Sequence, residues 1–135
     1  MKEAIIDTDM LSYYLKGDLD VARKVRDYLG QYPNLKISII TQYEIMGGLE
    51  YKKATKQIQE FESFLKECNV VNLTNNSIYH SAKAFGRLRR KGVTIGTSDL
   101  LIAGQALEQD WVLITNNEKH FKDIEGLDID NWRKG

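Results

Sequence analysis

The segment AIIDTDML at residues 4–11 decides the fold that we expect for this chain. Three apolar residues that end at an acid, Asp7, are typical of a short buried strand. The apolar positions that follow have helical spacing, and Thr8 or Asp9 is the expected N-cap of this helix. Gly17 is a residue at which such a helix ends. The chain is therefore expected to open with a strand followed by a helix.

The same alternation of strand and helix continues to the end of the sequence. Thr41 is the expected N-cap of one helix, with Glu44 in the position of a capping box. Further strands are expected at 36–40, 70–73, 111–114 and, as a short edge strand, 127–129, with helices at 19–29, 55–67, 74–91 and after 97. The pattern predicts an α/β fold over residues 1–135, as a single domain with a mostly parallel central sheet of four to five strands.

Composition is that of an ordinary globular protein. Hydrophobic residues make up 42% and charged residues 28%, and 19 basic residues balance 19 acidic ones, so disorder is not expected. The single cysteine, Cys68, cannot form an internal disulfide and favours a reducing cytoplasmic location. No signal peptide is recognisable, and no stretch approaches the roughly 20 apolar residues of a membrane span.

Three acidic residues are expected at one edge of the sheet. Functional groups of open α/β sheets gather beyond the carboxyl ends of the strands, and Asp7 ends the first strand. Glu44 lies one turn into the helix after the second strand, and Asp99 lies at the start of a late helix. Each has a structural alternative: Asp7 as a helix cap, Glu44 as half of a capping box, Asp99 as a partner of the helix dipole.

The combination of these acids points to a metal ion. Converging carboxylates repel one another and stay ionised only when a cation compensates their charge. Oxygen ligands without clustered cysteine or histidine favour Mg²⁺, for which Mn²⁺ can substitute. Such a cation activates water and stabilises charge on a phosphoryl group. The expected chemistry is therefore phosphodiester hydrolysis.

Four motifs in this order resemble the PIN-domain ribonucleases, and within them the VapC toxins of toxin–antitoxin pairs. They are IIDTDMLSYYL at 5–15, ITQYEIMGGL at 40–49, IGTSDLLIA at 95–103 and LITNNEKHF at 113–121. The resemblance covers nearly the whole chain, and the block at 95–103 is its most specific part. It implies a three-layer α/β/α PIN-like domain that cleaves RNA, forms a homodimer, and binds an antitoxin across the active-site groove.

The resemblance also implies individual roles. Asp7 and Asp99 would be the main Mg²⁺ ligands, and Glu44 would complete the acidic cluster directly or through water. Thr8 and Ser98 would orient ligands or waters through their hydroxyls. For Asp9, assistance through water and helix capping are both open.

The sequence departs from the family pattern after the fourth long strand. Many members have an acid where this chain has Asn117, and others have one where it has His120. Asn117 remains a candidate catalytic residue, and Asn116 and Asn117 could bind water or phosphate. Whether Asn117, Glu118 or His120 replaces the missing acid, and whether one or two metal ions bind, stays open.

Basic residues cluster on both sides of the acidic set. Every charge between residues 81 and 98 is positive, and a second basic cluster follows Glu44. A path for the RNA backbone is one interpretation; a solvated helix end or a surface for an acidic antitoxin segment are the others. The candidate RNA-binding residues are Arg87, Arg89, Arg90, Lys91, Lys52 and Lys53.

Two other functions fit parts of the sequence. A strand followed by Asp7-Thr8-Asp9 also resembles haloacid-dehalogenase-type phosphatases, in which the first Asp attacks phosphorus. With its fourth acid missing, the domain could also bind RNA or protein without cutting. RNA cleavage with and without a chelator distinguishes these interpretations.

Overall fold

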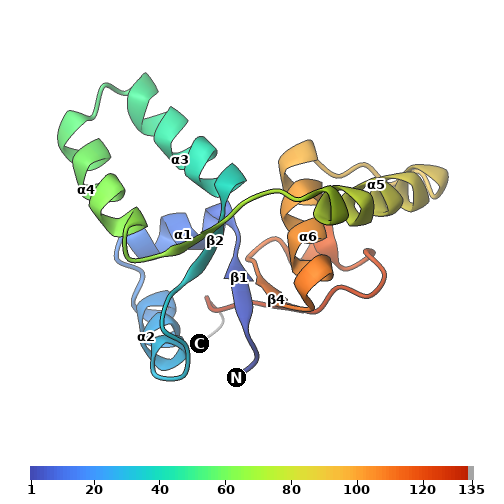
Figure 1. Cartoon of the computed structure of the whole chain (residues 1–135), viewed down its shortest axis with the longest axis horizontal. Helices are drawn as coiled ribbons and strands as arrows, with labels where there is room; N and C mark the ends of the chain where they lie inside the picture. Colours follow the sequence, from blue (N-terminus) through green and yellow to red (C-terminus); the bar gives the residue numbers. More distant parts are fainter. Residues whose placement is uncertain (134–135) are drawn as a thin grey trace.

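The computed structural model of the chain describes residues 1–133 (Figure 1). Strands and helices alternate along the chain, as the sequence predicted. The elements are β1 (Ala4–Ile6), α1 (Thr8–Leu15), α2 (Leu19–Leu29), β2 (Lys36–Ser38), α3 (Ile39–Tyr51), α4 (Thr55–Leu65), β3 (Asn69–Val71), α5 (Asn75–Arg90), α6 (Thr97–Gln109), β4 (Val112–Ile114), α7 (Glu118–Phe121) and β5 (Ile129–Asp130). Among the described residues, none of these helices has the length and apolar character of a membrane crossing.

The strands form one sheet in the order β3-β2-β1-β4-β5. All four pairings are parallel, with Ile6 opposite Ile37 of β2 on one side and Ile114 of β4 on the other. The prediction of an α/β fold with four to five strands is confirmed, and the sheet is wholly parallel. Since the chain runs outward from β1 to β3 and then returns to the other side of β1, the order reverses between β1 and β4, where such sheets form their crevice.

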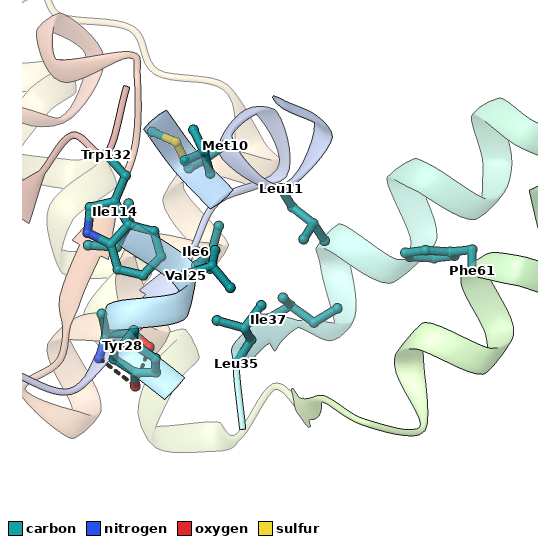
Figure 2. Close-up of a cluster of buried hydrophobic side chains, with 12 residues drawn as sticks. Ile6, Met10, Leu11, Val25, Tyr28, Leu35, Ile37, Phe61, Ile114 and Trp132 are labelled. Carbon is teal, nitrogen blue, oxygen red and sulfur yellow. Dashed lines mark hydrogen bonds between the residues drawn. The ribbon is translucent and has the colours of Figure 1, made fainter. Parts of the chain in front are cut away.

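Each face of the sheet has its own apolar core, because successive strand residues point to opposite faces. Ile6 belongs to the cluster with α1, α2 and α4, and Trp132 near the C-terminus closes it (Figure 2). Ile5 belongs to the cluster with α5, α6 and Phe121. Figure 1 shows α1 to α4 on one side of the sheet and α5 and α6 on the other. The three-layer arrangement is therefore confirmed.

Three helices begin earlier than the sequence predicted. The N-cap of α1 is Asp7 instead of Thr8 or Asp9, and that of α3 is Ser38 instead of Thr41. The N-cap of α6 is Gly96, where the sequence favoured Thr97 or Ser98. β2 stops earlier than its apolar run suggests, because Ile39 and Ile40 belong to the half-buried first turn of α3. Glu44 thus lies in the second turn of α3 and is no part of a capping box, so the capping-box alternative is wrong.

Close packing of α5 against α6 fixes the position of Asp99. A Cβ added to Gly104 would lie 1.9 Å from Ser81 Oγ and 2.5 Å from the Ser77 carbonyl oxygen, so only glycine fits. The Ser81 hydroxyl donates a hydrogen bond to the carbonyl of Leu100 at 2.8 Å. The first turn of α6, which carries Asp99, is therefore held by α5.

Candidate active site at the carboxyl ends of the strands

Asp7 lies at the centre of the site. It follows β1 directly, is 2% exposed, and its Oδ1 accepts a hydrogen bond from the Met10 amide at 2.8 Å. The Thr115 hydroxyl at the end of β4 donates to the same carboxyl group. Burial is the main cause that raises the pKa of Asp7 to about 6, with smaller contributions from the charges of Asp9 and Asp99 and against the effect of these two hydrogen bonds. Asp7 is thus both the N-cap of α1 and a residue of the site. Its buried negative charge needs a compensating partner.

Asp99 approaches Asp7 from the first turn of α6. Its carboxyl group is half-buried, and burial raises its pKa above the ordinary value. His120 Nδ1 lies 3.5 Å from Asp99 Oδ2 and acts in the opposite direction, whereas the charges of Asp9 and Glu44 raise the pKa further. The four acids are therefore close enough to influence one another.

Glu44 reaches the site from α3. Its Oε1 accepts a hydrogen bond from the Thr8 hydroxyl at 2.6 Å, and Thr8 Oγ1 lies 2.9 Å from Thr41 Oγ1. Thr41 is fully buried, which ties this chain of hydroxyl groups to the core. Thr8 therefore orients Glu44, and the role expected for its hydroxyl at a metal site stays a prediction.

Residues after β4 divide into two groups. Asn117 Nδ2 donates to Asp9 Oδ2 at 2.6 Å, so Asn117 belongs to the acidic cluster. Asn116 and Glu118 instead accept hydrogen bonds from Asn131 Nδ2, at 3.1 and 3.3 Å. Of the three candidates for the missing acid, Asn117 and His120 contact the cluster, and Glu118 accepts a hydrogen bond from Asn131.

Ser98 and two threonines complete the surroundings. Ser98 lies beside Asp99 in the first turn of α6 and is half-buried, and its expected role stays a prediction. Thr115 and Thr41 were missed as site residues, although both stand in the quoted motifs. The role of Thr115 depends on β4 pairing with β1, and no local pattern in the sequence specifies that order.

The basic candidates have different surroundings, and their role in RNA binding stays a prediction. Arg87 Nη1 pairs with Glu125 at 3.3 Å, and the Arg89 guanidinium lies 5.6 Å from the centre of the Phe85 ring. Arg90 and Lys91 are exposed at the end of α5, and Lys53 is exposed just after α3. Lys52 lines a groove that also contains Glu44.

Comparison with known protein families identifies the arrangement. The family model described as "PIN domain" matches residues 4–127. The chain belongs to the PIN-domain family. The phosphatase interpretation of the DTD segment at 7–9 is therefore wrong, and the three acids predicted from the sequence belong to a PIN domain.

Relatives place this PIN domain in the VapC group. It is 29% identical to "Ribonuclease VapC2" of Rickettsia felis over 96% of this chain and 98% of that protein. It is 32% identical to "tRNA(fMet)-specific endonuclease VapC" of Salmonella typhimurium over 71% of this chain and 74% of that protein. A solved "Toxin-antitoxin complex from Klebsiella pneumoniae" matches with a TM-score of 0.74 at 25% identity, over 93% of this chain and 95% of that one. The resemblance to VapC toxins is confirmed.

Proposed function

We propose that this PIN domain is a Mg²⁺-dependent endoribonuclease and the toxin of a toxin–antitoxin pair. The observation that carries the proposal is the buried Asp7 carboxyl group, which the charges of Asp9 and Asp99 approach at the crevice between β1 and β4. Burying a carboxyl group beside two like charges is costly unless a cation joins them. VapC relatives named as ribonucleases support RNA as the substrate.

The donor set fits Mg²⁺ better than zinc. Within residues 1–133, no three Asp, Glu, His or Cys side chains lie close enough together to form a complete metal cage. Mg²⁺ needs no such cage, because it keeps several waters and binds through one or two carboxylates. Asp7 and Asp99 are the two that would hold it, with Glu44 nearby; Mn²⁺, which accepts the same oxygen ligands, would substitute.

Each side chain of the site has a separate task in this proposal. A bound divalent cation supplies an activated water and stabilises charge on the phosphoryl group. Asp7 and Asp99 hold the negative charge that attracts the cation, and Thr115 keeps the Asp7 carboxyl group in place. Thr8 keeps Glu44 turned toward the cluster. The exposed carboxylates at the rim leave room for an RNA phosphate to approach.

RNA cleavage is expected to need a divalent cation. A labelled mixture of short RNAs and tRNAs should be cut by the purified chain in Mg²⁺ or Mn²⁺, and cutting should stop in excess chelator and return when Mg²⁺ is restored. Gel analysis of the products measures this. Cleavage that continues unchanged in chelator would contradict the proposal, and metal binding without cleavage of any RNA would favour a non-catalytic binding module.

The basic end of α5 is the proposed approach for RNA. Arg89, Arg90 and Lys91 lie on an exposed helix end that leads through residues 92–96 to Asp99. Phe85 is 50% exposed beside Arg89, so an aromatic face accompanies the cations. Both features suit a nucleic acid strand, since phosphates attract cations and bases stack on aromatic rings. Arg87 contributes less because Glu125 already pairs with it.

Replacing Arg89 and Arg90 together with alanine is expected to weaken RNA binding. Two lost phosphate contacts should reduce the slope of log affinity against log salt by about 1.4 to 1.8. Fluorescence anisotropy with a catalytically inactive chain at several salt concentrations measures both effects. The matched control removes Arg23 and Lys24 of α2, which also subtracts two charges. An unchanged salt slope in the Arg89 and Arg90 variant would separate these arginines from RNA binding.

An apolar groove beside the acids is the proposed antitoxin site. It has a volume of about 410 Å³, runs between α1, α3 and α4, and includes Thr8, Glu44, Leu49, Phe61 and Phe64. Apolar walls that end at acidic and hydroxyl groups suit an amphipathic helix with a polar end. The Klebsiella pneumoniae toxin–antitoxin structure supports such a partner.

The homodimer stays a prediction, and Tyr13 and Tyr14 of α1 are candidates either for its interface or for the core. Tyr14 packs against Phe64 with ring centres 6.1 Å apart, and the Arg133 guanidinium lies 4.0 Å from the centre of the Tyr13 ring. Both tyrosines are therefore engaged within one chain. Their exposure is only partial, which favours a core role over a dimer face.

A further inference from the structure

We propose that Asp9 adds negative charge beside the cation that Asp7 and Asp99 would hold, in place of the acid that many PIN-domain ribonucleases carry at position 117. The inference rests on the proposed function and names a residue whose part in it was undecided. The decisive contact joins two segments far apart in the sequence, since Asp9 lies in the first turn of α1 and Asn117 follows β4.

In the hydrogen bond between Asp9 and Asn117, only Asn117 can be the donor. Asn117 Nδ2 lies 2.6 Å from Asp9 Oδ2, and a carboxylate can only accept, so the amide group donates. The Asn117 backbone amide in turn donates to Thr115 Oγ1 at 2.9 Å. Because the Thr115 hydroxyl also contacts Asp7, positions 7, 9, 115 and 117 form one connected group. Asp9 is thereby held at the site.

Charge explains why only one of the two positions is acidic. Carboxylates at both 9 and 117 would place two negative charges in direct contact and repel each other. Two amides would leave no charge at all. The observed pair has one carboxylate and one amide, so it keeps one negative charge and one hydrogen bond. Exchanging the two residues would preserve both properties.

The position of Asp9 suits a contribution to cation binding. Asp9 follows Asp7 by two residues in the first turn of α1, and its contact with Asn117 joins it to Thr115, which contacts Asp7. The Asp9 side chain is also exposed and therefore open to an arriving cation. Neither other candidate does the same: Glu118 accepts a hydrogen bond from Asn131, and a histidine such as His120 carries no negative charge. Asp9 is thus the acid that best replaces the one missing at position 117.

An exchange of the two residues tests the inference. Isothermal calorimetry with Mn²⁺ on the full chain, without RNA, should show affinity at least about 10-fold weaker for Asp9→Asn than for the unaltered chain. The double variant Asp9→Asn with Asn117→Asp should regain affinity to within about threefold, since charge and hydrogen bond are both restored. Asn117→Asp alone should bind no more weakly than the unaltered chain. Asp20→Asn on α2 is the matched control, with no change expected.

The possible outcomes separate this inference from the proposed function. Circular dichroism first establishes that each variant is folded. Unaltered Mn²⁺ affinity in Asp9→Asn, or no recovery in the double variant, would overturn the role of Asp9. If Asp99→Asn abolishes Mn²⁺ binding while Asp9→Asn does not, the cation site stands and only the role of Asp9 fails. If Asp99→Asn retains full Mn²⁺ affinity, the cation site itself is wrong.

Discussion

Asp99→Asn is expected to lower the rate of RNA cleavage at least about 100-fold while leaving the fold intact. Asparagine has nearly the same shape as aspartate, but its amide carries no negative charge for a cation. The half-buried position of Asp99 means that the lost charge is poorly replaced by solvent. Single-turnover cleavage of a labelled RNA at saturating Mg²⁺ measures the effect.

The stability of this variant distinguishes a functional from a structural role. An acid in the first turn of a helix contributes about 0.3 to 1 kcal/mol through the helix dipole. Relief of the charge repulsion at Asp99 acts in the opposite direction, so the free energy of unfolding should change by less than about 1 kcal/mol. Asp27→Asn, an exposed acid on α2, is the control with full activity. Loss of the circular dichroism signal in Asp99→Asn would identify Asp99 as structural instead.

The sequence predicted the central acids because each follows a recognisable local signal. Asp7 ends an apolar run, and in a parallel sheet the residue that follows a strand lies at the edge where sites form. Asp99 begins a helix whose apolar spacing is clear. In both cases a periodic pattern of a few residues places the side chain, and the two segments meet because all five strands are parallel.

Features that depend on strand order or on short capping contacts could not be predicted in this way. The contact between Asp9 and Asn117 spans 108 positions and exists because β4 pairs with β1. Ile39 and Ile40 form the first turn of α3, although their β-branched side chains suit a strand by propensity. With Thr41 taken as the N-cap, the sequence alone could not exclude a capping role for Glu44.

Without a cation, the protein is expected to lose stability as the pH rises from about 4 to about 6, and Asp7 is the cause. Burial raises the pKa of Asp7 from 3.8 to about 6. Between these values the folded chain holds a proton that the unfolded chain has released, so rising pH favours unfolding. A difference of about two pH units corresponds to roughly 3 kcal/mol, fully present below pH 4 and lost above pH 6.

Asp7→Asn isolates this contribution, because asparagine is also a good N-cap and can still accept from the Met10 amide. In chelator at pH 8 the variant should be more stable than the unaltered chain by about 2 to 3 kcal/mol, and the two should be equally stable near pH 3.5. Urea unfolding at both pH values measures the difference. A variant less stable than the unaltered chain at pH 8 would mean that Asp7 is already compensated without a cation.

Adding Mg²⁺ at pH 8 should then reverse the order of stability. A cation that binds only the folded state stabilises it by about 4.1 kcal/mol at 1,000 times its dissociation constant, which is more than the deficit of about 2 to 3 kcal/mol, and Asp7→Asn should show almost none of this gain. The Asp7 carboxyl group would thus lower the stability of the folded chain without a cation and raise it when Mg²⁺ is bound. If Asp7 served only as a helix cap, Asp7→Asn would be the more stable chain at pH 8 both in chelator and in Mg²⁺. Stabilisation by Mg²⁺ that occurs only in the unaltered chain therefore assigns the buried charge of Asp7 to cation binding.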